Sequence, residues 1–355
     1  MGVRSTNPAQ SFVDDFFRSG TDGGGVASNT AEASGGVKIT SGNYVYHIFM
    51  GGNGPNYAGN PISAETFTIS SGTITNAEIL VVGGGGGAKN DGSGGGGAGA
   101  VYHATGVTLP SSPISITIGE RGTGAGSATN GSDTTFGPVT AQGGGYGNDG
   151  GNGNPGGSGG GGGGPGTPSG GSSTASPVSA FGVTFTAYGN AGGNNPTSND
   201  GGAGGGGAGA AGANRGSAAG TDGGDGRAFP SFPGPVLSPA LPTSAQNVDP
   251  NYGGNPWASA TTNPVALNSA WQTATGPTGL FGGGGGGGAY YPVSDRAQGG
   301  IGGGGSGSST GPSTGPGYAF PGLDYTGGGG GGATSSSSQS PGRPGGRGVV
   351  ILRYS

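Results

Sequence analysis

The chain is built around long uninterrupted runs of glycine, several of which begin where a strand-like apolar segment ends. The clearest case is AEILVVGGGGG, residues 77–87, in which four apolar residues pass directly into five glycines. A glycine run has no side chains to bury, so it either stays a flexible linker or becomes ordered through backbone hydrogen bonds alone. Runs of four or more glycines lie at 83–87, 94–97, 159–164, 204–207, 282–288, 302–305 and 327–332.

The rest of the composition favours order. A non-periodic chain with 99 Gly and 26 Pro among 355 residues would usually be classed as disordered. Disordered chains, however, usually owe their solubility to charge, and here only 8% of the residues are charged, with a net charge of −5. Glycine does not recur at every third position, which excludes a collagen triple helix. We therefore expect a folded protein in which glycine is a structural material.

Short apolar or alternating runs predict β-strands. In YVYHIF, residues 44–49, Tyr44, Tyr46 and Ile48 are expected on one face, with His47 among the residues of the other. The terminal run Val349–Tyr354 is the strongest strand signal in the chain. The predicted strands are 37–40, 44–49, 65–70, 77–82, 100–104, 114–118, 134–142, 181–186 and 349–354.

These strands predict one β-domain that the chain leaves and re-enters. Nearly all of them lie in residues 37–142, and a lone apolar strand at an exposed terminus would promote aggregation. The simplest arrangement inserts Val349–Tyr354 between earlier strands. The expected fold is all-β, with a small antiparallel β-sandwich (37–142 plus 348–355) closed by the C-terminal strand and essentially no α-helix. Residues 143–347 would form an inserted bundle of polyglycine-II helices.

Polyglycine II is a left-handed helix of three residues per turn that rises ~3.1 Å per residue and has no internal hydrogen bonds. Several such helices side by side can bond to one another, because glycine has no Cβ to hold them apart. Ordering a residue costs ~1–2 kcal/mol and a hydrogen bond contributes ~0.5–1.5 kcal/mol net, so a bundle needs a nucleus. Strands that continue directly into glycine runs, as at Val82–Gly83 and Gly348–Val349, would provide one.

The segments between glycine runs become loops displayed at the ends of the bundle. They are rich in aromatic residues amid Ser, Asn, Gly and Pro, which is the composition of a recognition surface on a rigid base. The alternative is that these rings cap the bundle and form small satellite cores. The candidate recognition residues are Tyr252, Trp257, Trp271, Tyr290, Tyr291, Tyr318, Phe320 and Tyr325.

The sequence offers little for catalysis or for a cofactor. The two histidines, His47 and His103, lie within strand patterns and are expected to be structural, and no nucleophile motif is present. Without cysteine there is no thiolate metal site. The segment TDGGDG, residues 221–226, could bind calcium, but it lacks the nonapeptide array of such sites. We expect a non-enzymatic protein with no catalytic residue, no metal and no cofactor.

The composition also indicates which classes of partner the chain can bind. The acidic balance and the scarcity of lysine argue against nucleic acid, because no basic stripe can gather phosphates. No segment approaches the ~20 apolar residues of a membrane span, and the first residues lack the apolar region of a signal peptide. We therefore expect no membrane insertion and synthesis in a cytoplasm.

Residues 1–36 form a polar leader with one aromatic group. Phe12, Phe16 and Phe17 stand around an Asp-Asp pair. The leader either packs on its own domain or docks on a neighbouring subunit, and these three rings are the candidate subunit contacts. It is also compatible with a homo-oligomer.

The framework resembles the glycine-rich domain family of tailed-phage tail-fibre and adhesin proteins, including marine and cyanophage-like members. The motifs that carry the resemblance are YVYHIF, ETFTISSGTI, AEILVVGGGGG, ISITIGERGTG, TTFGPVTAQGGG and GGRGVVILRYS, which together cover roughly residues 37–355. The leader does not resemble the fibre-attachment domain of the T-even phage adhesins, which leaves its docking partner open.

The resemblance implies a β-sandwich followed by packed polyglycine-II helices whose loops bind host surface receptors. On this chain those loops carry the aromatic residues named above. The implied partners are a host cell-surface receptor, either a glycan or an outer-membrane protein, and other virion subunits, and the implied location is the virion surface. The alternative is a structural virion or filament subunit that assembles through its N-terminal segment. Ice or surface binding would require flat, regular Thr or Ala arrays, which the irregular loops do not provide.

Overall fold

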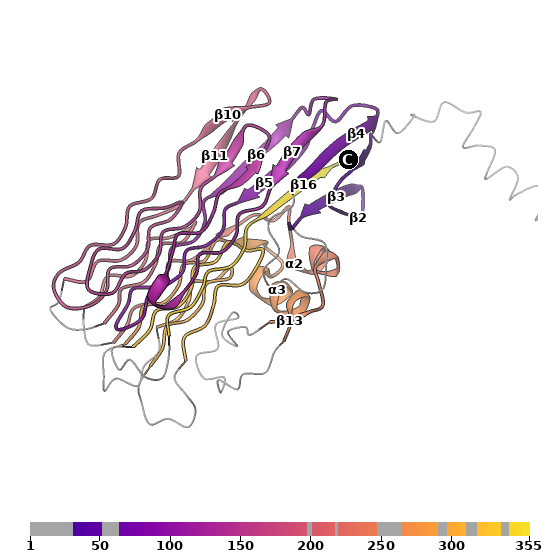
Figure 1. Ribbon diagram of the computed structural model, residues 1–355. Coiled ribbons are helices and arrows are strands. Elements are labelled where there is room, and N and C mark those ends of the chain that lie inside the picture. The colour runs from indigo at the N-terminus through magenta and orange to yellow at the C-terminus, as the bar shows by residue number, and fades with distance from the viewer. Residues whose placement is uncertain are drawn as a thin grey trace, which may run out of the picture.

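The computed structural model describes residues 31–51, 64–196, 201–216, 219–246, 265–289, 297–309, 318–334 and 341–355. Within them, two antiparallel sheets pack face to face, and the chain continues from their strands into a long bundle of extended segments (Figure 1). The seven-stranded sheet has the order β10 (Val178–Ala180), β11 (Val183–Tyr188), β6 (Val101–Val107), β5 (Ala77–Val82), β16 (Val349–Tyr354), β3 (Tyr44–Phe49) and β2 (Val37–Ser41). The five-stranded sheet has the order β1 (Glu32–Ser34), β4 (Glu65–Ser71), β7 (Ile114–Thr117), β8 (Thr134–Phe136) and β9 (Val139–Ala141).

The C-terminal strand closes the larger sheet, as the sequence predicts. β16 lies between β5 and β3, with Ile351 opposite Leu80 on one side and Ile48 on the other. Because every residue of this central strand except Arg353 is buried, the terminal apolar run is protected from edge-to-edge aggregation. The all-β sandwich closed by the last strand is confirmed.

The core between the two sheets is formed by alternate residues of facing strands. Phe49, Val81 and Val350 point into it from the larger sheet, and Phe67 and Phe136 point into it from the smaller one. The opposite face of the larger sheet carries the other alternation, including Tyr46 and Ile48 of β3. The two faces predicted for residues 44–49 are therefore confirmed.

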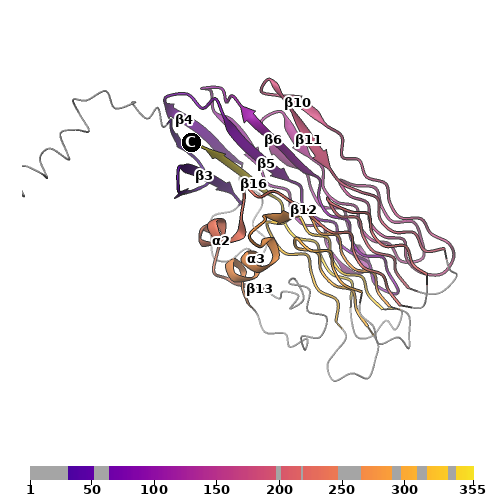
Figure 2. The same cartoon turned by 180° about the vertical axis from the view of Figure 1, so that it is seen from behind.

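A small helical layer covers that second face of the larger sheet (Figure 2). It contains β12 (Arg227–Ala228), α2 (Gly234–Leu237), the 3-10 turn η2 (Ser238–Ala240), β13 (Ala245–Gln246), β14 (Val265–Ala266), α3 (Leu267–Thr275) and β15 (Leu280–Phe281). In α3, Leu267, Ala270, Trp271 and Ala274 are buried, which is the spacing of one helix face. The helix ends at Gly276, whose φ of 57° suits glycine. These two short helices were not predicted.

The glycine-rich segments, here called threads, run side by side away from the strands (Figure 1). Along residues 83–88 the backbone N–H groups donate in turn to Ala100, Ser132, Gly346, Gly97, Thr129 and Arg343. The partner thread therefore recurs after every third residue, first 94–100, then 129–133, then 341–348. A β-strand bonds to neighbours on two sides only, whereas three directions at a period of three are what packed polyglycine-II helices require.

The carbonyl groups of thread 83–88 accept hydrogen bonds from three further threads, at 119–124, 142–148 and 327–334. The thread is thus surrounded by six neighbours in a hexagonal array. Five other threads also have six bonded neighbours, and together with 83–88 they are here called the inner threads. The five others are 94–100, 158–164, 201–207, 282–289 and 327–334. A Cβ added at Gly86 would lie well inside 3.0 Å of the Gly145 carbonyl, a backbone group that cannot rotate away. Glycine is needed here for close approach.

The predicted division of the chain needs two changes. The hairpin β10–β11, from within residues 143–347, extends the seven-stranded sheet. Threads at 83–88, 94–100, 119–124 and 129–133 belong to the bundle, although they lie within residues 37–142. From β5 onwards strands and threads therefore alternate along much of the chain, and strands such as β5, β6 and β7 pass directly into or out of a thread. No helix of the described residues is long and apolar enough to cross a membrane.

Candidate recognition site at the end of the bundle

The bundle has one end fixed on the sandwich and one end free, here called the distal end. Threads that leave β5, β7 and β9 turn there at residues 89–93, 124–128 and 149–152 and run back towards the sandwich, and the thread that leaves β11 is described there up to residue 196. The C-terminus lies at the opposite end of the molecule (Figure 1). The described chain also enters there, because the Ala31 carbonyl accepts a hydrogen bond from the Tyr354 hydroxyl at 3.4 Å.

Side chains at the outside of the bundle replace the missing neighbours of the outer threads. Amide and carboxylate oxygens accept backbone N–H groups of the adjacent thread that would otherwise point to solvent. These pairs are Asn130 with Tyr146, Asp133 with Gly143, Asn194 with Gly170, Asp222 with Gln298 and Asp225 with Ile301, at 2.7–3.2 Å. In two of the threads the acceptors are three residues apart, which matches the helical repeat. The sequence carries this signal as N-x-x-D and D-x-x-D, and it was missed.

This arrangement gives the TDGGDG segment a structural role. Asp222 and Asp225 each accept a backbone N–H of the thread 297–301 through Oδ1. Within the described parts of the chain, no group of three or more His, Cys, Asp or Glu side chains is placed to hold a metal ion.

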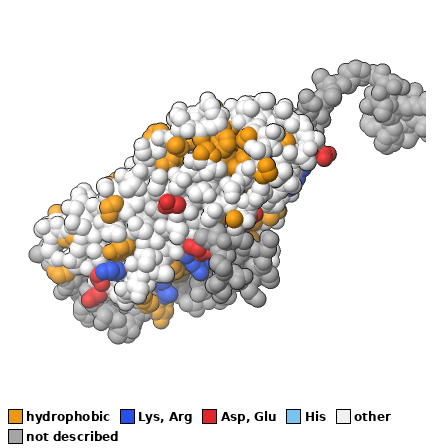
Figure 3. Space-filling view, turned by 45° about the horizontal axis from the view of Figure 1, so that its top comes forward, with side chains coloured by type: hydrophobic (Ala, Val, Ile, Leu, Met, Phe, Trp, Pro, Cys, Tyr) orange, Lys and Arg blue, Asp and Glu red, His pale blue; other side chains and the backbone are white. Residues whose placement is uncertain are grey.

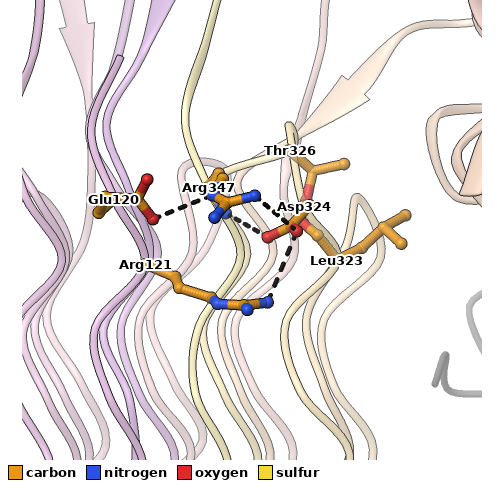
Figure 4. A network of polar contacts seen from close by, with 6 residues as sticks. All are labelled: Glu120, Arg121, Leu323, Asp324, Thr326 and Arg347. Atoms are coloured by element: carbon orange, nitrogen blue, oxygen red, sulfur yellow. Dashed lines mark hydrogen bonds and ion pairs between the residues drawn. The ribbon is translucent and has the colours of Figure 1, made fainter. Parts of the chain in front are cut away.

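A buried ionic network fixes the junction between thread and strand (Figure 4). Arg347, just before β16, lies 2.9 Å from Glu120 and 3.8 Å from Asp324, and Asp324 is 3.5 Å from Arg121. Asp324 also accepts the backbone N–H of Arg347 at 3.0 Å. Burial lowers the pKa of Arg347, but the neighbouring Asp324 and Glu120 carboxylates outweigh this, and the net pKa is raised. The network joins the ends of three threads at the base of the bundle.

A second polar group crosses the helix-covered face of the larger sheet. Glu78 lies 2.8 Å from His103 and 2.7 Å from Arg353. Burial raises the pKa of Glu78, but the hydrogen bonds from His103 and Ser231 and the charge of Arg353 outweigh it, so that the pKa is lowered overall. The Glu78 carboxylate lies between the Ser231 hydroxyl and the His103 imidazole, whereas a nucleophilic triad needs the imidazole in the middle. The order of these groups suits a structural clamp.

His47 lies in the sandwich core, as predicted. Its ring donates from Nδ1 to the Gly35 carbonyl at 2.8 Å and stacks against Tyr354 at 5.9 Å between ring centroids. Burial lowers the pKa of His47, the Lys38 charge adds to this, and the Gly35 hydrogen bond partly opposes it.

Three of the candidate recognition residues are buried, so the expectation that their rings are displayed is wrong. Trp271 is 0% exposed and Tyr325 1%, and Trp271 donates from Nε1 to the Tyr325 carbonyl at 3.0 Å. Both belong to the core under the helical layer, at the sandwich end of the bundle. Phe320 is 7% exposed. The alternative that some rings form satellite cores is correct for Trp271 and Tyr325.

Of the other receptor-binding candidates, Tyr318 is the one that lies within the described residues. Tyr318 is half-buried at the start of the thread 318–322. The remaining candidates, both receptor-binding and subunit-contact, lie outside the described residues: Tyr252, Trp257, Tyr290, Tyr291, Phe12, Phe16 and Phe17. Ala289 and Ala297, which flank residues 290–296, end and begin threads at the distal end.

Sequence reasoning missed one aromatic residue that is accessible. Tyr146 is half-buried near the distal end, with the Lys89 ammonium 5.8 Å from its ring centroid. Lys89 in turn lies 3.1 Å from Asp149. Charged side chains are sparse over most of the molecular face seen in Figure 3. The signal for Tyr146 is a single aromatic residue within the glycine thread GGGYGN, residues 143–148.

The chain matches the model of a known protein family. The model of a family described as "glycine-rich domain" matches residues 62–355, which is most of the chain. A comparison with curated proteins finds no relative. The matched residues contain all of the inner threads and the closing strand.

Proposed function

Because the chain belongs to the glycine-rich domain family, we propose that it is a non-enzymatic surface adhesin of a phage virion that recognises a host cell. One observation carries the proposal. A hexagonal bundle bonded in three directions holds many chain reversals together at one end, far from the end where the described chain enters and leaves. A rigid scaffold lowers the entropy cost of binding for loops that it displays.

The chemistry of the chain supports recognition rather than turnover. Its two histidines are engaged in structural contacts, and its buried carboxylates hold threads or strands together. The receptor is a host glycan or outer-membrane protein. Among the segments that we assign to its recognition are residues 290–296, with Tyr290 and Tyr291, which connect the distal thread ends at Ala289 and Ala297. The leader, with Phe12, Phe16 and Phe17, is assigned to the contact with another virion subunit.

The test is competition for host cells. Purified full-length protein is added to cells before the phage, and free phage is counted after adsorption. We expect the protein to bind the cells and to reduce adsorption, and we expect the variant with residues 290–296 replaced by a Gly-Ser segment of equal length to do neither. The matched control replaces Tyr44, which is 39% exposed on β3 at the other end of the molecule, by Ala.

Two results would contradict the proposal. The first is protein that folds but binds no cells of a host that the phage infects. The second is concentration-dependent fibres that disappear on deletion of residues 1–36 without any cell binding, which would support the structural subunit instead.

A further inference from the structure

The described part of the bundle carries one group of side chains with the chemistry of a sugar-binding site, here called the Tyr146 patch. It lies on the outside of the bundle near the distal end, where four threads and two of their turns meet. Its members are Lys89, Asn130, Tyr146, Asp149 and Asn154. The patch includes none of residues 290–296, although Lys89 and Asp149 belong to the distal turns at 89–93 and 149–152.

The hexagonal array is incomplete at this corner. Thread 142–148 bonds to 83–88, 94–100, 129–133, 153–157 and 158–164, so that one side of it faces outward. The N–H of Tyr146 points to that side and donates to Asn130 Oδ1 at 3.0 Å. Asn130 also donates to the Pro155 carbonyl at 3.0 Å, which ties the two threads on either side of the gap together. At this position the perimeter of the array is therefore completed by side chains and not by a further thread.

Hydrogen bonds hold the backbone of Tyr146 in place on both sides. Its N–H is held by Asn130, and its carbonyl accepts the N–H of Asn154 at 3.0 Å. Lys89 is fixed in the same way, because its N–H donates to the Gly147 carbonyl at 3.0 Å. A ligand that stacks on this ring would therefore need little ordering of the protein, which favours affinity.

The polar groups around the ring retain hydrogen-bonding capacity. Lys89 and Asp149 are paired at 3.1 Å, yet their side chains remain 27% and 33% exposed. Asn130 is exposed and Asn154 half-buried, and each amide nitrogen has two hydrogens, of which one is used within the described residues. Donors, an acceptor and an aromatic ring are thus neighbours on one partly exposed patch.

We propose that the Tyr146 patch binds a neutral sugar of a host surface glycan. The C–H groups of a pyranose face are weakly positive and apolar, and they stack on the electron-rich face of Tyr146. The sugar hydroxyls, which both donate and accept, bond to the asparagine amides and to the Lys89–Asp149 pair. The positive and the negative group balance each other, so an anionic ligand gains no net attraction. This inference rests on the proposed function and names the ligand class for a position on the side of the bundle.

The experiment uses full-length protein and an immobilised panel of neutral and acidic glycans. We expect binding to neutral glycans, and we expect Tyr146→Ala to weaken it about tenfold, as for a residue at the centre of an interface. Asp149→Ala, which leaves the thread untouched, should weaken it as well and serves if Tyr146→Ala fails to fold. Tyr44→Ala is the matched control and should bind like the wild type.

The outcomes separate this inference from the proposed function. If the protein binds host cells but Tyr146→Ala and Asp149→Ala bind glycans as the wild type does, the patch is not the site and the adhesin proposal stands. Binding of host cells with no glycan bound, or with acidic glycans only, also overturns the patch. If neither host cells nor glycans are bound, both proposals fail.

Discussion

The substitution Gly86→Ala tests the central physical claim, that inner threads are held by backbone contacts too close for a side chain. The added methyl would overlap the carbonyl of Gly145 and, beyond it, that of Gly144. Neither is the end of a flexible side chain, so the thread 142–148 has to move away as a unit. Two hydrogen bonds cross this contact, from Gly144 N to Gly84 O at 2.8 Å and from Gly147 N to Gly87 O at 2.9 Å.

The expected loss follows from these contacts. Overpacking a tight interior costs ~1–3 kcal/mol, and each buried hydrogen bond left unmade costs ~1–3 kcal/mol more. The reduced entropy of the unfolded chain returns only ~0.4–1 kcal/mol. We expect Gly86→Ala to lower the free energy of unfolding by roughly 3–6 kcal/mol, a large part of the ~5–15 kcal/mol typical of folded proteins.

The assay is urea unfolding followed by circular dichroism and by tryptophan fluorescence, since Trp271 is buried under the helical layer. Gly216→Ala is the matched control, because a Cβ at Gly216 meets nothing within 4 Å. It should leave stability unchanged or raise it by ~0.4–1 kcal/mol. Equal unfolding midpoints for the two variants would refute the reasoning, because the threads would then have room for a methyl group.

Three other predictions concern the base of the bundle and the sandwich. Arg347→Met removes one of the two arginines beside the Asp324 carboxylate, whose side chain is 2% exposed and which keeps Arg121 at 3.5 Å, so it should cost less than the ~3–5 kcal/mol of an unpaired buried charge in thermal or urea unfolding. Trp271→Ala should cost about 3–5 kcal/mol through the cavity it leaves, while folded protein keeps its cell binding, which a displayed Trp271 would not allow. For His47 the folded pKa lies below the unfolded value of 6.5, so its contribution is full above about pH 6.5, decreases as the pH falls towards the folded pKa, and is constant below it. His47→Gln should remove this loss from urea midpoints measured across that interval, and an unchanged pH profile would show that another group is responsible.

Much of this architecture could be predicted from the sequence because two patterns are strictly local. Apolar alternation places Tyr46 and His47 on opposite faces of β3, and it identifies β16 as a buried strand. Glycine runs predict the inner threads, since every run of four or more glycines except 302–305 falls in one of them. The exception contains a turn, where Gly302 and Gly303 have φ values of 86° and 105°.

The errors arise where the environment of a residue depends on distant segments. Trp271 is in an aromatic, proline-rich stretch that reads as a display loop, but its ring fills the space between α3 and the turn at Tyr325. The i, i+3, i+4 pattern around it was the available signal for a helix. The reverse holds for Tyr146, which stands in a glycine thread and is accessible only because the array lacks a neighbour there. Neither position can be deduced without knowing which threads are adjacent.

The same geometry limits where any binding chemistry can evolve on this fold. A thread with six neighbours has no direction free for a large side chain, and the residues other than glycine in the inner threads are small, such as Ala98 and Ala203 at 0% exposure. Outer threads have a free direction only once in three residues, and much of it is used by Asn and Asp to cap the array. Side chains able to contact a partner are therefore restricted to the distal turns and to gaps in the perimeter. If variants selected for altered host range carried their changes in inner threads, the separation of scaffold from recognition surface would be disproved.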